Sequence, residues 1–296
     1  MKDTIFAAID IGSNAVRLLI KKYDSNDEKL KKLLLLRVPL RLGFDVFDKG
    51  KVSAKKAENL LRLMKAYRQL MKIYSVDVVR ACATSAMRDA ENGPELIRSI
   101  FDKTGIKIEI IAGEEEARIV YNNHMEMKND HTGNFLYVDV GGGSTEVNFL
   151  SDGVLKKSMS FNIGTVRLLT GKVKESEWER LRSELLPIAA KYRDIQIIGS
   201  GGNINKLYKL AREKDETAKS LSVEELSRMY HQLKPLSVEQ RMKLFDLKAD
   251  RADVIIPASE IFLHIASIVD AKRIIVPVIG VADGIIDGLL ASALNS

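Results

Sequence analysis

The sequence carries the same phosphate-handling pattern twice. Near its start an apolar run ends in Asp10-Ile11-Gly12-Ser13-Asn14, and near its middle a second run ends in Asp139-Val140-Gly141-Gly142-Gly143-Ser144. In each copy, glycine allows the backbone N–H groups to face an anion, and an Asp at the strand end can orient a divalent cation. The sequence therefore predicts two phosphate-binding loops, which we expect to hold phosphate from both sides of a cleft.

The residues after each loop indicate how the loop is used. Residues 15–20 and 147–150 are short and rich in β-branched side chains, so each loop is predicted to close a β-hairpin rather than to open a helix. This disfavours a Rossmann turn, which needs the helix. The chain also contains no G-x-x-x-x-G-K-[ST] pattern, which disfavours a P-loop NTPase.

Three further segments carry groups that suit phosphate, and each has a structural alternative. Loop hydroxyls at residues 84–85 with Arg88 can hold phosphate oxygens, although an Arg after a strand is more often solvated or ion-paired. The carboxylates of residues 114–116 either offset a helix macrodipole or position water for in-line attack. Gly199-Ser200-Gly201-Gly202 is either a tight turn or an anion site at a helix start. The residues alone leave these alternatives open.

The other reactive side chains predict structural roles. His124, His131, His231 and His264 show no metal-ligand spacing, and Cys82 lies in an apolar run typical of core packing. The net charge of +6 and the isoelectric point of about 9.1 permit an anionic partner without specifying one. Because the chain lacks zinc-finger spacing and an aromatic RNA-stacking motif, we expect no DNA partner.

The elements that must position these residues alternate between strand and helix patterns. With 296 residues and 46% hydrophobic content, the chain can bury the cores of two domains. The motif repeat restarts after a polar segment at residues 128–133, so we place the domain change near residue 123. Strands are predicted near residues 5–22, 33–42, 76–83, 107–112, 195–198 and 273–278, with further strands in the second half up to about residue 161. Helices are predicted near 53–74, after 92–94, from 114 onward, and near 175–194, 203–213, 222–232 and 255–269, with a closing apolar helix after residue 284.

The cellular location is predicted from two features that we do not find in the sequence, a membrane-spanning apolar stretch and a signal peptide. No apolar stretch is expected to approach the roughly 18 residues of a spanning helix, and the N-terminus is expected to carry no signal-peptide core. We therefore expect a cytoplasmic protein without a membrane partner.

Taken in order, these segments resemble the exopolyphosphatase and guanosine pentaphosphate phosphatase (Ppx/GppA) family of the actin-like ATPase superfamily. The resemblance rests on five motifs that span nearly the whole chain, at residues 8–14, 84–88, 113–118, 139–146 and 199–202. It implies an α/β fold of two ribonuclease-H-like domains flanking a central cleft, in a short two-domain form. These would be residues 1–122 and 123–283, with a closing helix at about 284–296 packing back on the first domain.

The resemblance also implies a role for each site residue. Glu116 would position the attacking water and Arg88 would act with it as a catalytic residue. Asp10, Asp139 and Glu146 would hold Mg²⁺, with Mn²⁺ as the alternative, because oxygen-only ligands favour these ions over zinc. Phosphate oxygens would be bound by Gly12, Ser13, Asn14, Gly141, Gly142, Gly143, Ser144, Gly199, Ser200 and Gly201.

The activity implied is release of terminal orthophosphate from inorganic polyphosphate or guanosine pentaphosphate, by metal-assisted in-line attack of water in a monomer or homodimer. The partner is therefore polyphosphate or a phosphorylated guanosine nucleotide, and the sequence does not separate these two. The alternative is a non-hydrolytic nucleotide or alarmone sensor of the same fold. A small-molecule kinase of the same superfamily is disfavoured by the short second half.

Overall fold

The computed structural model describes residues 2–125, 132–277 and 280–294. Its contacts divide the chain into two compact units, Met1–Met125 with Val281–Ser296 (unit 1) and Glu126–Gly280 (unit 2). Most of the loop predicted at residues 128–133 lies outside the described residues, as do His131 and the side chain of His124.

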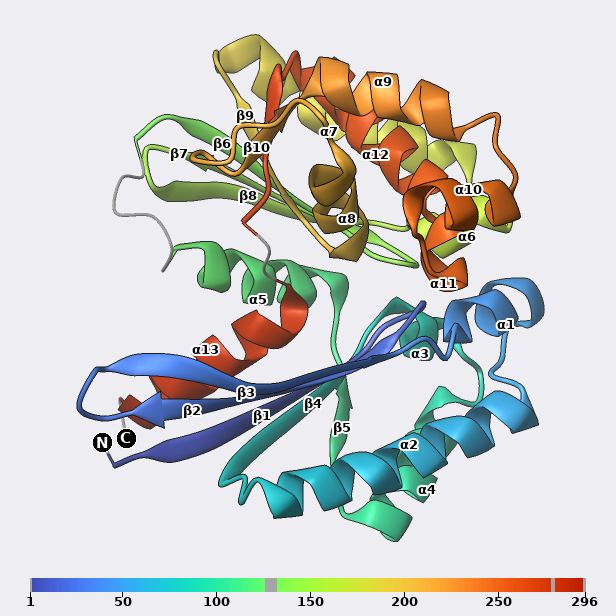
Figure 1. Cartoon of the computed structure of the whole chain (residues 1–296), viewed down its shortest axis with the longest axis vertical. Coiled ribbons are helices and arrows are strands. Elements are labelled where there is room, and N and C mark those ends of the chain that lie inside the picture. Colours follow the sequence, from blue (N-terminus) through green and yellow to red (C-terminus); the bar gives the residue numbers. More distant parts are fainter. Residues whose placement is uncertain (1, 126–131, 278–279, 295–296) are drawn as a thin grey trace. The chain divides into compact units, whose positions relative to one another are not determined.

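Unit 1 is built on one five-stranded sheet (Figure 1). Its strands are β1 (Thr4–Ile11), β2 (Val16–Asp24), β3 (Lys29–Val38), β4 (Val78–Ala83) and β5 (Ile108–Ile110), in the order β3-β2-β1-β4-β5. β1, β2 and β3 form an antiparallel meander, whereas β1, β4 and β5 are parallel. The three parallel strands therefore end at the same edge of the sheet, here called the carboxyl edge, and begin at the opposite amino edge.

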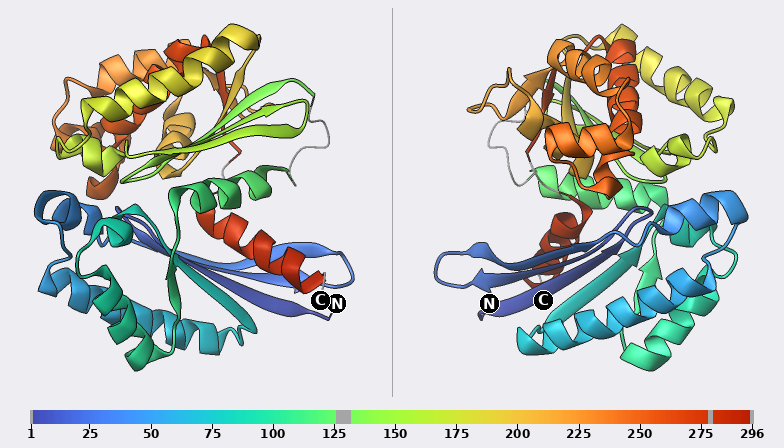
Figure 2. Two further views of the ribbon diagram at one scale, coloured as in Figure 1. Left: turned by 180° about the vertical axis from the view of Figure 1, so that it is seen from behind. Right: turned by 45° about the vertical axis from the view of Figure 1, so that its right-hand side comes forward.

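Helices cover both faces of this sheet. They are α1 (Leu42–Lys49), α2 (Ala54–Ile73), α3 (Ser85–Asp89), α4 (Gly93–Thr104), α5 (Gly113–Met125) and α13 (Val281–Leu294). α2 and α4 pack together on one face, and α13 packs on α5 and β1 at the other (Figures 1 and 2). The closing helix of the chain therefore completes the core of unit 1.

The predicted helix at residues 53–74 is confirmed as α2, with Ser53 as its N-cap. The strand predicted at residues 33–42 is wrong at both ends, because β3 runs from Lys29 to Val38 and Leu42 already belongs to α1. β3 lies at the edge of the sheet, where lysines protect an open strand, and its polar composition hides its start. Cys82 is fully buried, and this burial raises the pKa of its thiol to about 12, so core packing is confirmed.

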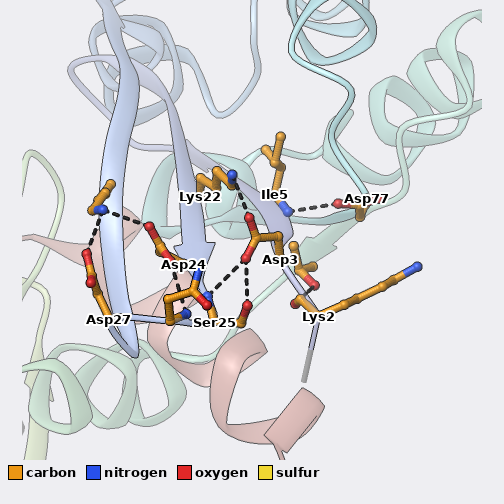
Figure 3. A network of polar contacts seen from close by, with 11 residues as sticks. Lys2, Asp3, Ile5, Lys22, Asp24, Ser25, Asp27 and Asp77 are labelled. Atoms are coloured by element: carbon orange, nitrogen blue, oxygen red, sulfur yellow. Dashed lines mark hydrogen bonds and ion pairs between the residues drawn. The ribbon is translucent and has the colours of Figure 1, made fainter.

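Polar contacts tie the start of β1 to the neighbouring strands and loops at the amino edge of this sheet (Figure 3). Asp3 pairs with the Lys22 ammonium at 2.7 Å and accepts hydrogen bonds from the N–H and hydroxyl of Ser25. Asp77 accepts a hydrogen bond from the Ile5 N–H at 2.8 Å. The Lys22 hydrogen bond lowers the pKa of Asp3 well below its ordinary value. The carboxylates at this edge are therefore engaged in holding β1 to its neighbours.

Unit 2 is built on a six-stranded sheet of related topology. Its strands are β6 (Asn134–Val140), β7 (Thr145–Ser151), β8 (Val154–Phe161), β9 (Gln196–Ser200), β10 (Ser220–Ser222) and β11 (Arg273–Ile275), in the order β10-β11-β9-β6-β7-β8. β6, β7 and β8 form the antiparallel meander, and β6, β9 and β11 are parallel. Its helices are α6 (Thr165–Leu169), α7 (Glu175–Lys191), α8 (Gly202–Leu210), α9 (Val223–Leu233), α10 (Val238–Phe245), α11 (Ala249–Ala252) and α12 (Ile255–Val269).

The expectation that no apolar stretch reaches spanning length is wrong. Within the described residues, Ala249–Val269 is long and apolar enough to cross a membrane, with 21 residues and a mean hydropathy of 1.6. However, 67% of its most apolar window is buried, and residues such as Ile261, Phe262 and Ile265 belong to the core of unit 2. By length and composition a buried core helix and a spanning helix are alike, and here the apolar side chains pack inside the unit.

Candidate active site

The first Asp-x-Gly loop closes the β1–β2 hairpin, as the sequence predicts. The Gly12 N–H donates to the Ala15 carbonyl at 3.1 Å, which closes the turn. A Cβ on Gly12 would lie 3.1 Å from the same carbonyl oxygen, tighter than nearly all real contacts. A side chain at this position would therefore push against the Ala15 carbonyl, so glycine suits this turn.

Three predicted segments of unit 1 meet at its carboxyl edge. The Ser13 and Ser85 hydroxyls are 2.9 Å apart, which joins the β1–β2 loop to the start of α3. Arg88, on the same short helix, donates from Nη1 to the Ile111 carbonyl at 2.7 Å, just before α5 begins. This is the one hydrogen bond that its side chain makes among the described residues, and a guanidinium carries five N–H donors. The remaining donors can bind a phosphate.

The three carboxylates at the start of α5 differ sharply in environment. Glu114 is exposed, and Glu115 pairs with the Arg80 guanidinium at 2.6 Å. Glu116 is only 5% exposed. The structure therefore separates two solvated or ion-paired acids from one buried acid, and the buried one is the predicted catalytic residue.

Asp10 is buried and has a partner that the sequence analysis missed. Its carboxylate lies 2.5 Å from Nη1 of Arg17, the residue directly opposite on β2. The signal was present, because Asp10 and Arg17 are equally far from the centre of the predicted hairpin turn. The positive charge of Arg17 neutralises the negative charge of the Asp10 carboxylate. Asp10 is therefore less suited to hold a cation than the sequence implies.

The second Asp-x-Gly loop repeats the geometry of the first. The Gly141 N–H donates to the Ser144 carbonyl at 3.0 Å, and a Cβ on Gly141 would lie 3.1 Å from that oxygen. The internal repeat predicted from sequence is thus a repeat of turn geometry as well as of residue types.

The carbonyl and N–H groups of this loop are used differently. The Gly141 and Gly142 carbonyls accept hydrogen bonds from the N–H groups of Thr165 and Val166 at the start of α6, at 3.0 and 2.8 Å. By contrast, the N–H groups of Gly142 and Gly143 donate to no group in the part of the chain that the structure describes. Adjacent backbone N–H groups of this kind form an anion-binding nest.

Two buried acids face each other beside this loop. Asp139 on β6 lies directly opposite Glu146 on β7, and the two are 6% and 1% exposed. The Ser200 hydroxyl donates to Asp139 at 2.7 Å and the Ser160 hydroxyl donates to Glu146 at 3.0 Å. Like charges directly opposite destabilise a strand pair, and an oxygen-only donor set of this kind suits Mg²⁺ or Mn²⁺. The pair therefore fits the predicted metal.

The described residues of unit 2 do not supply a complete set of metal ligands. Across residues 2–125, 132–277 and 280–294, no three His, Cys, Asp or Glu side chains gather as a metal site. Mg²⁺ is commonly held by one or two carboxylates together with water and substrate phosphates, so a two-carboxylate site is consistent with this ion.

The third glycine-rich segment of unit 2 packs against the same acid. Gly201 has φ 103° and ψ 157°, a conformation essentially confined to glycine, and a Cβ there would lie 3.1 Å from Oδ1 of Asp139. Arg251 donates to the Asn203 side chain at 2.9 Å, and its guanidinium would collide with a Cβ on Gly202. Arg251 was missed because α11, which carries it, has no motif.

Gly199, which is predicted to contact phosphate, has a packing role in the structure. Gly199 lies inside β9, where a Cβ would be 3.0 Å from Ile274 and 3.1 Å from Phe262. It therefore allows the core to pack closely, and it is the following residues, Ser200 and Gly201, that reach Asp139.

The predicted site residues form one group in each unit. Unit 1 holds Asp10, Gly12, Ser13, Asn14, Arg88 and Glu116, and unit 2 holds Asp139, Gly141, Gly142, Gly143, Ser144, Glu146, Gly199, Ser200 and Gly201. The sequence analysis expects both groups to act on one substrate, and this stays a prediction.

Two α/β units, each with an antiparallel meander joined to parallel strands and each carrying an Asp-x-Gly hairpin turn, define a protein of the actin-like ATPase fold. The sequence pattern of the Ppx/GppA phosphatase family matches residues 22–293, and the chain belongs to that family.

Solved structures support this assignment. The crystal structure of the Aquifex aeolicus member of the Ppx/GppA family is 27% identical, with a TM-score of 0.76 over 98% of this chain and 99% of that one. An exopolyphosphatase from Cytophaga hutchinsonii has a TM-score of 0.85 at 24% identity, over 98% of both chains, which shows a shared fold.

Two curated relatives match about half of this chain. A bifunctional 3-dehydroquinate synthase/phosphatase of Fusobacterium nucleatum is 36% identical over 168 residues, which are 55% of this chain and 25% of the relative. Exopolyphosphatase 1 of Mycobacterium bovis is 28% identical over 160 residues, 54% of this chain and 46% of the relative. The matches therefore span less than half the length of either relative.

Proposed function

We propose that the chain hydrolyses the terminal phosphoanhydride of linear inorganic polyphosphate and releases orthophosphate. Membership of a phosphatase family and the similarity to an exopolyphosphatase support this reaction class. The observation that carries the proposal is Glu116, the one buried acid among three consecutive carboxylates at the start of α5. A buried carboxylate beside phosphate-binding groups suits a residue that positions water.

Phosphate binding is assigned to groups with donors to spare. In unit 2 these are the Gly142 and Gly143 N–H groups, and in unit 1 the Arg88 guanidinium and whichever of the paired Ser13 and Ser85 hydroxyls does not donate to the other. Such donors, fixed before substrate arrives, stabilise the negative charge that spreads over the phosphoryl oxygens in the transition state. The loose transition state of phosphoryl transfer makes this positioning the main catalytic contribution of the protein.

Water attack is assigned to Glu116. Its carboxylate would accept a hydrogen bond from the water and take its proton as the new P–O bond forms. The terminal phosphate leaves the chain as orthophosphate, and the shortened chain keeps the bridging oxygen. Positioning by a carboxylate is sufficient, because a strong base is not needed for this reaction.

Asp139 and Glu146 are proposed to hold Mg²⁺, or alternatively Mn²⁺. When bound, the ion would neutralise charge on the phosphate oxygens. Asp10 already pairs with Arg17, so we assign it to orienting the first loop and not to holding the metal. Ser160 and Ser200 would keep the two unit 2 carboxylates in place through their hydroxyl donors.

Orthophosphate release from polyphosphate in the presence of Mg²⁺ tests the proposal, with guanosine pentaphosphate assayed in parallel. Release that is lost in Glu116→Gln would support the hydrolase, and the faster substrate would identify its class. Absence of release from both substrates would contradict hydrolysis and favour the non-hydrolytic sensor.

A further inference from the structure

A basic groove lies between α2 and α4 in unit 1. These helices pack side by side on one face of the sheet (Figures 1 and 2). The groove has a volume of about 600 Å³. It is lined by Lys65, Ala66, Arg68, Gln69, Lys72, Lys103 and Thr104, so four of its seven lining residues are cations and none is acidic.

The four cations differ from other lysines at the amino edge of the sheet. Lys22 pairs with Asp3, and Lys31 pairs with two aspartates at 2.7 and 2.8 Å (Figure 3). In the described part of the chain, no carboxylate lies within ion-pair distance of any of the four groove cations. All four are exposed, so the groove presents uncompensated positive charge to solvent.

Helix stability alone does not explain this arrangement. Lys72 and Lys103 lie in the last turns of their helices, where a cation offsets the macrodipole. Lys65 and Arg68 lie further back on α2, spaced three and four residues from their cationic neighbours, and like charges at this spacing destabilise a helix. The row of cations Lys65, Arg68 and Lys72 on α2, here called the α2 stripe, would therefore be stabilised by an anion from outside the chain.

The groove is remote from the residues assigned to hydrolysis in unit 1. Lys72 and Lys103 end the helices that lead into β4 and β5, so they lie at the amino edge, whereas Arg88 and Glu116 lie at the carboxyl edge. The six residues of β4 separate the two edges by about 20 Å, at roughly 3.3 Å per residue. A short anion cannot reach both places.

We propose that the α2–α4 groove is a second anion site that binds the distal part of an extended polyphosphate chain. This inference rests on the proposed function, since it takes the ligand to be the same polymer. The stripe from Lys65 to Lys72 extends about 10 Å along α2, at 1.5 Å per residue, which matches a linear polyanion better than a single phosphate. The lining residues include no aromatic side chain, so nucleic acid bases would find no stacking platform there.

Binding in a Glu116→Gln background tests this site without hydrolysis. The double variant Lys65→Gln/Lys72→Gln is compared with Lys209→Gln/Lys243→Gln, which removes the same two charges from exposed positions on α8 and α10. Loss of two exposed ion contacts predicts that the groove variant binds long-chain polyphosphate about tenfold more weakly. The control variant should bind it within about twofold of the parent protein. Raising the salt concentration should shrink the difference between the variants.

Tripolyphosphate and single-stranded RNA are the two comparison ligands. Tripolyphosphate is too short to span the unit, so its affinity should fall no more in the groove variant than in the control. The inference would be overturned if the groove variant lost as much affinity for tripolyphosphate as for long-chain polyphosphate, or if the control variant lost as much affinity for polyphosphate as the groove variant. Tighter binding of RNA than of polyphosphate by the groove would also overturn it. The readout is equilibrium binding, so absence of hydrolysis in the wild-type protein would contradict the proposed function while leaving this result interpretable.

Discussion

The two copies of the Asp-x-Gly hairpin carry opposite charges at the residue that faces the Asp. In unit 1 this residue is Arg17 and in unit 2 it is Glu146. The same backbone therefore carries an ion pair in one copy and two facing acids in the other. Two facing acids suit a cation better than an existing ion pair does, which is why we propose the metal at Asp139 and Glu146.

Gly201 provides a residue-scale test of how Asp139 is held. Gly201→Ala places a Cβ in a conformation that costs about 1–3 kcal/mol for a non-glycine residue, and it moves the Asp139 carboxylate. We predict a lower unfolding midpoint together with a higher Mg²⁺ concentration for half-maximal activity. Gly171→Ala is the matched control, since Gly171 also has a positive φ but its Cβ would meet nothing within 4 Å. An unchanged Mg²⁺ requirement in Gly201→Ala would contradict the account.

At the scale of elements, the periodicity of apolar residues predicted the long helices and the hairpins, but it missed the short helices. α2 has enough turns for Leu60, Met64 and Met71 to repeat on one face, and the two hairpins follow from strand–turn–strand patterns. α1, α3 and α6 have five to eight residues each, too few for a repeat to be recognised. Arg251 could not be assigned for a related reason, because only tertiary packing brings α11 to the start of α8.

The packing of α12 on α7 predicts a pH dependence of stability in unit 2. His264 on α12 contacts Trp178 on α7 edge-on, with ring centroids 4.9 Å apart. Burial first, and then the charge of Arg182, lowers the pKa of His264 below its ordinary value of 6.5. As pH falls below 6.5, the unfolded chain therefore binds a proton that the folded chain does not, and stability is lost until the folded pKa is reached.

The test is the unfolding midpoint at pH 7.5 and 5.5, followed by the fluorescence of Trp178, the single tryptophan of the chain. His264→Phe keeps an aromatic ring but cannot titrate, so its midpoint should fall less between these pH values than that of the wild-type protein. An equal fall in both proteins would show that His264 does not contribute.

For the whole molecule, the division into units does not follow the sequence order, because one unit is made of two separate segments of the chain. Unit 1 contains both the start of the chain and α13, whereas unit 2 is continuous. The sequence analysis expected a closing helix at about 284–296 to pack on the first domain. α13 starts earlier, at Val281, and its side chains Ile285 and Ile286 enter the same cluster as Cys82.

Removal of residues 281–296 should therefore damage unit 1 and spare unit 2. Val281, Ile285 and Ile286 are buried, and each such side chain contributes about 1.5–3 kcal/mol when fully buried. We predict that Cys82, the single cysteine, becomes reactive toward a thiol reagent while Trp178 fluorescence still shows a cooperative unfolding transition. A protected thiol in the shortened chain would contradict this assignment of α13.

The central claim is that Glu116 positions the water that attacks a terminal phosphate. The most direct measurement is the rate of orthophosphate release from long-chain polyphosphate with Mg²⁺, for the wild-type protein, Glu116→Gln and Glu114→Gln. Glu114 is an exposed acid on the same helical turn, so it serves as the matched control. We predict a loss of about 10²–10⁴-fold in Glu116→Gln with an unchanged unfolding midpoint, and a rate for Glu114→Gln within about twofold of wild type. A wild-type rate in Glu116→Gln would contradict the account.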